Sequence, residues 1–221
     1  MKAMILAAGR GERMRPLTDR TPKPLLPLGG KPMIVHLIEQ LRDAGIRELV
    51  VNHAHLGAQI EETLNDGSAW GVEIRYSAEG QALETAGGIA KALPLLGSEP
   101  FIVANGDIYC RYDFSALRRR ELGKDLCHLV LVDNPPHHAG GDFHLREGRV
   151  HNQGEPKLTF SGIALYRPEL FAGIAPGTKA PLAPLLRQAA EAGLASGEHY
   201  AGIWYDVGTP ERLAQVEALL R

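Results

Sequence analysis

Positive charge gathers near the amino terminus, in a stretch rich in glycine and proline. Residues 1–31 carry seven lysine or arginine residues against two acidic residues, a formal charge of +5. The whole chain carries −2, so the rest of it carries −7. Such a local excess favours a compact polyanion as ligand, and a nucleoside triphosphate is the first candidate. The cations are Lys2, Arg10, Arg13, Arg15, Arg20, Lys23 and Lys31.

Several residues in this stretch are suited to binding phosphate. Gly9 and Gly11 permit positive φ and a close backbone approach, so that successive N–H groups can point at phosphate oxygens. Arg13 adds a forked donor that is always charged. Lys23 stands between two prolines, and we expect an extended backbone there that aims its ammonium group in a fixed direction.

The loop differs from two better-known phosphate-binding loops. Met14 stands where the dinucleotide fingerprint has its third glycine, and the second predicted strand ends at Asn52-His53 without a carboxylate for a ribose. No Gly-x-x-x-x-Gly-Lys-Ser/Thr occurs, so the loop is not a P-loop. On the loop alone, the alternative is a surface turn that happens to be basic.

Strand and helix patterns alternate through the first part of the chain, which predicts parallel βαβ units. The expected strands are 3–6, 48–51, 72–76, 101–104 and 126–132, and the expected helices are 32–44, 56–64, 85–96 and 114–122. The fold class is therefore α/β, with a Rossmann-like, mostly parallel twisted sheet and helices on both faces. Short strands (142–145, 158–166, 199–203), a helix at 182–191 and a last helix from Pro210 follow, a small mixed β extension.

Length and composition exclude several classes of protein. At 221 residues with 44% hydrophobic content, we expect one domain, residues 1–221, with a nucleotide-binding part at 1–132 and a second part at 133–221. Cys110 and Cys127 are too few for a disulfide framework, which favours a cytoplasmic protein. No apolar run is long enough for a membrane span, and local basic charge disfavours a nucleic-acid groove. The sequence predicts no protein partner.

Two carboxylates stand where a metal could bind. Ligands of open parallel sheets lie beyond the carboxyl ends of the strands, and Asn105-Gly106-Asp107 follows the fourth predicted strand. Asp206 is a charge inside a strand-like run, where burial requires a partner. Together with triphosphate oxygens, Asp107 and Asp206 would suit Mg²⁺. A turn residue bonded to its own backbone is the alternative for Asp107.

The joint pattern resembles the sugar-1-phosphate nucleotidylyltransferases. Their signature Gly-x-Gly-x-Arg-(x)-x-Pro-Leu-Thr, followed by Pro-Lys-Pro, is matched within residues 4–33. Glu12 departs from it, since many relatives carry threonine there, and we expect its side chain to point away from the phosphates, toward Arg10 or Arg15. Further matching blocks are Leu83-Glu84-Thr85-Ala86-Gly87-Gly88, Asn105-Gly106-Asp107, Phe160-Ser161-Gly162-Ile163 and Trp204-Tyr205-Asp206-Val207-Gly208-Thr209.

The resemblance implies a nucleotide-diphospho-sugar transferase fold and a set of site residues. Those for the nucleotide are Ala8, Gly9, Gly11, Glu12, Arg13, Lys23, Gln81, Thr85, Gly87 and Asn105. Those for the sugar phosphate are Gly140, Glu155, Ser161 and Gly162, and the paired metal ligands are Asp107 and Asp206. Arg13, Lys23 and Asp107 would be catalytic. A solvated loop glutamate and an ordinary helix start remain the alternatives for Glu155 and for residues 85–88.

The implied reaction needs no covalent enzyme intermediate. A sugar-phosphate oxygen attacks the α-phosphorus, pyrophosphate leaves in line, and the protein positions the groups and neutralises charge. Arg13 and Mg²⁺ would offset charge on the pyrophosphate, and Lys23 would hold the α-phosphate and acceptor phosphate together.

The acceptor is predicted from finer likenesses. The short chain, Leu-Glu-Thr-Ala-Gly-Gly and the loop at 133–138 are most similar to members that join UTP to N-acetylmuramic acid 1-phosphate, giving UDP-MurNAc in peptidoglycan recycling. Glucose-1-phosphate thymidylyl- or uridylyltransferases and mannose-1-phosphate guanylyltransferases are the alternatives within the family. Outside it stand a non-catalytic nucleotide-binding regulatory module and an NAD-dependent reductase, which Met14 disfavours.

Overall fold

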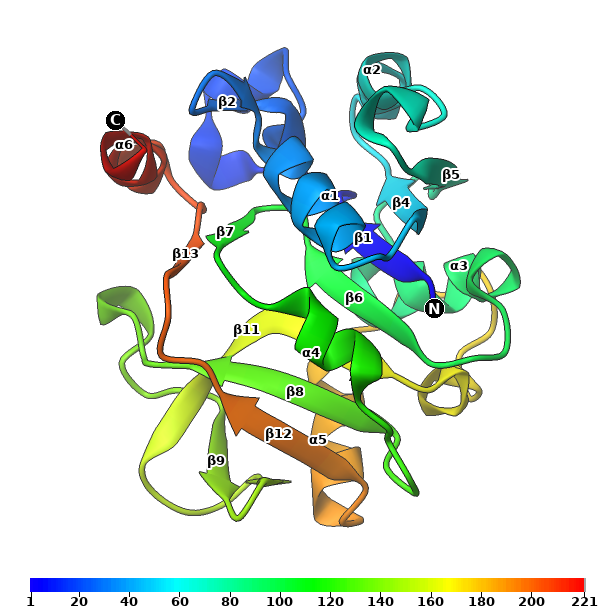
Figure 1. Ribbon diagram of the computed structural model, residues 1–221, viewed down its shortest axis with the longest axis vertical. Helices are drawn as coiled ribbons and strands as arrows, with labels where there is room; N and C mark the ends of the chain where they lie inside the picture. Colours follow the sequence, from blue (N-terminus) through cyan, green and yellow to red (C-terminus); the bar gives the residue numbers. More distant parts are fainter. Residues whose placement is uncertain (221) are drawn as a thin grey trace.

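A nine-stranded sheet with the strand order β5-β4-β1-β6-β11-β8-β12-β10-β9 forms the centre of the molecule (Figure 1). The computed structural model describes residues 1–220. The sheet strands are β1 (Ala3–Leu6), β4 (Glu48–His53), β5 (Glu73–Ala78), β6 (Phe101–Asn105), β8 (Cys127–Val132), β9 (Phe143–Arg146), β10 (Arg149–His151), β11 (Lys157–Tyr166) and β12 (Ala195–His199). Two small sheets pair β2 (Pro27–Leu28) with β3 (Lys31–Pro32) and β7 (Ile108–Cys110) with β13 (Trp204–Asp206).

Helices cover both faces of the sheet, as the alternating pattern predicts. They are α1 (Met33–Asp43), α2 (Gly57–Leu64), α3 (Glu84–Leu96), α4 (Phe114–Arg119), α5 (Ala183–Glu191) and α6 (Pro210–Leu219). β5, β4, β1 and β6 are parallel, and Ile5 of β1 lies opposite Val51 on one side and Ala104 on the other. This part of the sheet is the expected parallel α/β architecture.

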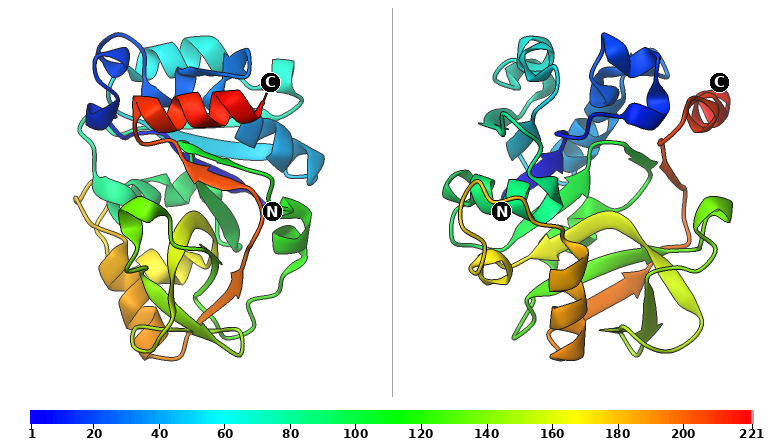
Figure 2. Two further views of the ribbon diagram at one scale, coloured as in Figure 1. Left: turned by 90° about the vertical axis from the view of Figure 1, so that its left-hand side faces the viewer. Right: turned by 180° about the vertical axis from the view of Figure 1, so that it is seen from behind.

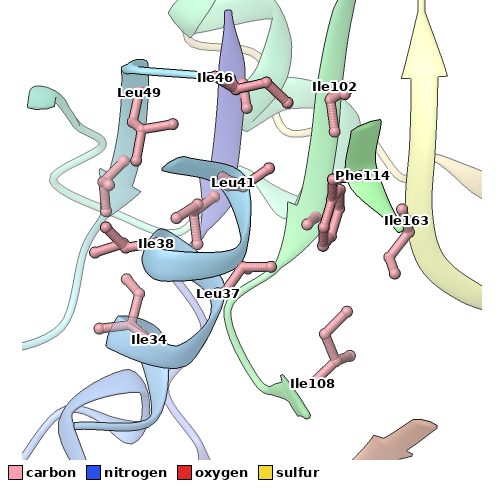
Figure 3. Close-up of a cluster of buried hydrophobic side chains, with 14 of the residues drawn as sticks. Ile34, Leu37, Ile38, Leu41, Ile46, Leu49, Ile102, Ile108, Phe114 and Ile163 are labelled. Carbon is pink, nitrogen blue, oxygen red and sulfur yellow. The ribbon is translucent and has the colours of Figure 1, made fainter. Parts of the chain in front are cut away.

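Two apolar clusters separate the layers. One face of the sheet packs against α1, α2 and α4, and Figure 3 shows Leu37, Ile38 and Leu41 of α1 beside the strands that carry Leu49 and Ile102. The opposite face packs against α3 and α5. Both helices can be seen in the right-hand view of Figure 2, which shows the molecule from behind. Successive strand residues alternate between the two clusters because side chains of a strand point to opposite faces.

A strand from the second half of the chain lies in the middle of the sheet. β11 inserts between β6 and β8, antiparallel to both, and its pairing with β8 shifts between Phe160 and Ile163. Chain order therefore does not give strand order here. The predicted strand at 199–203 is wrong: β12 ends at His199, Tyr200 donates its N–H to Leu131, and the chain then turns before β13. The short strands β2, β3, β7 and β10 were not predicted.

A third apolar cluster joins the two ends of the chain. Met14 and Leu28 of the amino-terminal segment pack with Val207 and with Val216 of α6. Figure 2 shows α6 in red beside the dark-blue amino-terminal loop. Thr209 caps α6, as predicted, by accepting a hydrogen bond from the N–H of Arg212. Among residues 1–220, no helix has the length and apolar character that a membrane crossing requires.

Candidate active site

The basic loop between β1 and β2 is folded into three short 3-10 turns, Glu12–Met14, Leu17–Asp19 and Lys23–Leu25. Gly11 begins the first of them with φ +68°, and its carbonyl accepts the hydroxyl of Thr18 at 2.7 Å. A Cβ on Gly11 would lie 3.1 Å from the Cβ of Lys23. Both the left-handed backbone and this close approach favour glycine, so Gly11 sets how the loop packs on Lys23.

Lys23 is held differently from the expectation. The predicted extended backbone is wrong, because Lys23 opens a 3-10 turn in which Leu25 donates its N–H to Pro22 at 2.8 Å. Pro24 fits this turn since the first turn of a helix needs no N–H from it. The Lys23 side chain is 9% exposed and its ammonium is paired with the carboxylate of Asp107.

A cavity of about 230 Å³ lies beyond the carboxyl ends of β1 and β6. Six residues predicted from the sequence line it, namely Ala8, Gly9, Lys23, Thr85, Asn105 and Asp107. The loop after β1 and the Asn105-Gly106-Asp107 segment after β6 thus meet, as strand ends in a parallel sheet should. We call this the nucleotide cavity.

The polar side chains of Asn52 and Glu79 also line this cavity, although neither was predicted as a site residue. Asn52, at the end of β4, accepts the N–H of Ala7 at 2.8 Å and donates to Glu79 at 2.6 Å. Glu79 in turn accepts the N–H of Leu83 at 2.8 Å. These buried bonds tie the loop after β1 to the start of α3. Nothing but the position of Asn52 at a strand end could have indicated this role.

Five residues of the predicted nucleotide set lie outside the lining of this cavity, namely Gly11, Glu12, Arg13, Gln81 and Gly87. Gly11 lies against Lys23, and Glu12 is exposed with a carboxylate oxygen 3.8 Å from Nε of Arg10. Gln81 is exposed. The N–H of Gly87 donates to the carbonyl of Ala180 at 3.1 Å, so the chain itself caps the start of α3 at this position. Glu12 points toward Arg10, one of the two directions expected.

Asp107 and Asp206 lie on neighbouring segments. β7 and β13 are antiparallel, Asp206 lies opposite Ile108, and Val207 donates its N–H to the carbonyl of Asp107 at 2.8 Å. Each carboxylate faces a cation: Asp107 pairs with Lys23, and Asp206 pairs with Arg212. Nε2 of His137 lies 3.1 Å from Asp206. Neither Arg212 nor the contact of His137 with Asp206 was predicted.

Arg13 lies on the Asp206 side of the site. It lines a cavity of about 930 Å³ together with His137, Asp206 and Arg212. A Cβ on Gly208 would lie 2.3 Å from the guanidinium of Arg212 and 3.1 Å from that of Arg13, so both cations converge on this glycine. Arg212 follows the cap of α6 by three residues, a position that sequence alone would not single out.

The donor set fits a hard divalent cation. Two carboxylates from neighbouring segments offer oxygen ligands, and Mg²⁺ commonly binds through one or two carboxylates plus phosphate oxygens and waters. Over residues 1–220, no group of three or more His, Cys, Asp or Glu side chains is arranged to hold a metal by itself. Two protein carboxylates would leave coordination positions that phosphate oxygens and waters could fill.

The predicted sugar-phosphate residues divide into two groups. Ser161 is buried and gives its hydroxyl to the carbonyl of Val130 at 2.7 Å. Gly162 has φ +80°, and a Cβ there would lie 2.4 Å from Nδ2 of Asn105, so it makes room for that side chain. Gly140 and Glu155 stand in the loops before β9 and β11, which pair with each other.

A second cavity of about 430 Å³ adjoins the first and shares Glu84, Thr85 and Asn105 with it. We call it the acceptor cavity. Its other lining residues are Asp142, Phe143, Phe160, Pro181, Leu182, Ala183, Leu186 and Arg187. Glu84 has φ +60°, a conformation that costs a residue with a side chain about 1–2 kcal/mol. Such strain gathers at functional sites.

Neither cysteine takes part in this chemistry. Burial raises the pKa of the Cys110 thiol to about 11 and that of Cys127 to about 12. Both thiols therefore stay protonated near neutral pH, whereas nucleophilic and metal-binding cysteines act as thiolates.

The comparisons with known proteins agree with one another. Residues 2–143 match the nucleotidyl transferase family. The N-acetylmuramate alpha-1-phosphate uridylyltransferase of Neisseria meningitidis serogroup B is 54% identical over 99% of this chain and 98% of its own. The protein of that name from Caulobacter vibrioides is 35% identical over 99% and 96%.

A solved structure shares the fold. A protein of Bacillus anthracis, described as a glucose-1-phosphate thymidylyltransferase in complex with sucrose, superposes with a TM-score of 0.87 at 23% identity, over 100% of this chain and 95% of that one. The sheet order, the converging strand ends and these matches lead to one conclusion. The chain is an enzyme of the nucleotidyl transferase family.

Proposed function

We propose that this enzyme transfers the uridylyl group of UTP to N-acetylmuramic acid 1-phosphate, giving UDP-MurNAc and pyrophosphate. The observation that carries the proposal is the 54% identity to an N-acetylmuramate alpha-1-phosphate uridylyltransferase over nearly the full length of both chains. The adjoining nucleotide and acceptor cavities support it, because the reaction requires both substrates to meet at one phosphorus atom.

Lys23 is proposed to hold the α-phosphate and the acceptor phosphate together. Its place in the nucleotide cavity, beside the acceptor cavity, supports this role. Arg13 is proposed to face the departing pyrophosphate, supported by its position next to Arg212 at Gly208. A preorganised cation that meets developing charge in a water-poor site stabilises the transition state more than the ground state.

Asp107 and Asp206 are proposed to hold Mg²⁺, which would neutralise charge on the triphosphate when bound. Their neighbouring positions, with Asp107 just before β7 and Asp206 at the end of β13, and their oxygen donors support this. Lys23 and Arg212 compensate the two carboxylates in the structure. Thr85 and the backbone of Ala8 and Gly9 are proposed to contact the nucleoside.

Residues 1–132 are proposed to supply most of the nucleotide side and residues 133–221 most of the acceptor side. The lining of the two cavities supports this division, since Asp142, Phe160 and Arg187 belong only to the second. The amino sugar would come from peptidoglycan turnover, and the cytoplasm, where UTP is made, would be the place of reaction.

A coupled pyrophosphate-release screen tests the proposal. It crosses UTP, dTTP, GTP and CTP with the 1-phosphates of MurNAc, GlcNAc, glucose and mannose, with Mg²⁺ and with EDTA. We expect the highest kcat/KM for UTP with MurNAc-1-phosphate and no turnover in EDTA. A preference for dTTP with glucose 1-phosphate, or for GTP with mannose 1-phosphate, would select those alternatives. Triphosphate binding without pyrophosphate in any well would indicate a regulatory module.

A further inference from the structure

Asn105 of β6 and Phe160 of β11 line the acceptor cavity, and three further parts of the fold complete it. The start of α3 supplies Glu84 and Thr85, the segment around β9 supplies Asp142 and Phe143, and the segment that leads into α5 closes the far side. Aromatic and aliphatic side chains form much of the wall, namely Phe143, Phe160, Leu182 and Leu186. A ligand with apolar patches as well as polar groups fits such a cavity.

The charged side chains of this cavity differ in whether they have partners within the protein. The carboxylate of Asp142 accepts the N–H of Phe160 at 2.8 Å and lies 3.0 Å from Nε2 of His138. Glu84 lies 3.5 Å from the ammonium of Lys179. Arg187 is the one cation of the lining, and within residues 1–220 no carboxylate lies within 4.0 Å of its guanidinium nitrogen atoms. An exposed guanidinium thus stands at the α5 wall with its donors available.

The backbone of α5 fixes where Arg187 can reach. Leu186 and Ala189, on either side of it, are 2% and 3% exposed and pack on the sheet. The side chain of Asn152 donates to the carbonyl of Arg187 at 2.8 Å. The helix is therefore held firmly while the Arg187 side chain remains exposed, so a ligand would have to order that side chain but not the helix.

N-acetylmuramic acid 1-phosphate differs from N-acetylglucosamine 1-phosphate by one lactyl ether at C3, which adds a methyl group and a carboxylate. Glu84 and Asp142 would repel a carboxylate elsewhere in the cavity, whereas a guanidinium binds one through two parallel hydrogen bonds. A sugar without a carboxylate, such as glucose, offers this cation no such group to bind.

We infer that Arg187 binds the lactyl carboxylate of the acceptor and sets the preference for N-acetylmuramic acid 1-phosphate over its unsubstituted counterpart. The inference rests on the proposed function. Arg187 is a specificity-determining residue here, not a catalytic one, because the carboxylate it binds is remote from the reacting phosphorus. Its contribution is therefore expected mainly in KM, through binding that is equal in ground and transition states.

The experiment measures kcat and KM with UTP and Mg²⁺ for both acceptors, MurNAc-1-phosphate and GlcNAc-1-phosphate. Arg187→Gln keeps a polar side chain and removes the charge, and Arg187→Lys keeps the charge without the fork. Arg47→Gln is the matched control, since Arg47 is exposed at the start of β4 and lines neither cavity. Thermal unfolding checks that each variant is folded.

In Arg187→Gln we expect kcat/KM for MurNAc-1-phosphate to fall about 10–100-fold, the scale of one hydrogen bond to a charged group, chiefly through KM. The ratio of the two acceptors' kcat/KM should collapse toward one. Arg187→Lys should restore part of the preference, and Arg47→Gln should keep all of it.

The two proposals fail in different ways. If the native enzyme releases no pyrophosphate with MurNAc-1-phosphate, the proposed function is wrong and this inference goes with it. If the native enzyme prefers MurNAc-1-phosphate and Arg187→Gln keeps the same acceptor ratio, the proposed function stands and the inference about Arg187 is overturned. An equal loss for both acceptors also overturns it, because that result would mean a general structural effect.

Discussion

Lys23 has 9% of its side chain exposed, and such an ion needs compensation because an unpaired buried charge costs several kcal/mol. Asp107 supplies it in the structure. The charge of Asp206 is compensated in the same way, by Arg212. These pairs keep the site near charge balance. In the proposed reaction, phosphate oxygens would bring negative charge that both cations could bind instead.

Lys23→Ala should lower kcat by roughly 10²–10³, the scale of one lost transition-state charge contact. The loss also leaves Asp107 without its cation. Steady-state pyrophosphate release measures the effect, and thermal unfolding shows whether the variant is folded. Lys31→Ala is the control, since Lys31 pairs with Glu39 and lines neither the nucleotide nor the acceptor cavity. A folded Lys23→Ala enzyme with near-native turnover would remove Lys23 from the mechanism.

Asp206→Asn should raise the Mg²⁺ concentration for half-maximal rate by about tenfold or more, because a carboxylate proposed to bind the metal loses its charge. Titration of activity with MgCl₂ at fixed UTP measures it. Asp19→Asn changes a surface carboxylate that pairs with Arg15 and should leave the titration unchanged. An identical Mg²⁺ curve for the Asp206 variant would show that this carboxylate does not bind the metal.

At the scale of elements, the amino-terminal loop depends on one glycine. Gly11 combines a left-handed backbone with a close approach to Lys23. Gly123 shares the first property, with φ +55°, but a Cβ there would meet nothing within 4 Å. The two positions therefore separate backbone strain from disturbance of the site.

Gly11→Ala and Gly123→Ala should each lower the free energy of unfolding by about 1–2 kcal/mol, the cost of a left-handed alanine. Only Gly11→Ala should also reduce kcat/KM, because its methyl group displaces Lys23. Urea unfolding and pyrophosphate release report the two effects. Equal activity of the two variants would mean that the loop tolerates the shift.

At the scale of the whole molecule, a charged network joins the sheet to α4. Glu198 of β12 lies within hydrogen-bond distance of His128 of β8 and accepts from Tyr112, which precedes α4. Arg120, which follows α4, lies 2.9 Å from it. The hydrogen bond from His128, followed by that from Tyr112, lowers the pKa of Glu198 from its ordinary 4.5 to about 2, against the opposing effect of burial.

This depressed pKa makes stability depend on pH. The contribution of Glu198 is fully present above the unfolded pKa of 4.5 and is lost as pH falls through the folded value near 2. Glu198→Gln should therefore destabilise the protein by on the order of 1–3 kcal/mol at pH 7, and by progressively less toward pH 2. Urea unfolding at pH 7, 5 and 3 measures this. A difference that stays constant with pH would exclude the charge of Glu198 as its origin.

Local sequence patterns were enough to predict most of the helices and strands and the gathering of cations in the amino-terminal loop. The parallel strands, the helices between them and the cap at Thr209 follow from periodicity and capping, which act over a few residues. Gly9, Lys23, Asn105 and Asp107 could be placed together because parallel strand ends meet at one edge. The resemblance to the family motif implied that Asp107 and Asp206 act together as metal ligands.

Other features depend on contacts between segments far apart in the chain, and only the folded structure reveals them. Insertion of β11 between β6 and β8, the capping of Gly87 by Ala180 and the approach of Arg212 to Arg13 join residues far apart in the chain. Periodicity carries no record of such pairings, because burial and hydrogen bonding choose partners only once the layers have packed. Arg187 shows the same limit: its type was visible in the sequence, but its place facing the acceptor cavity depends on how α5 docks on the sheet.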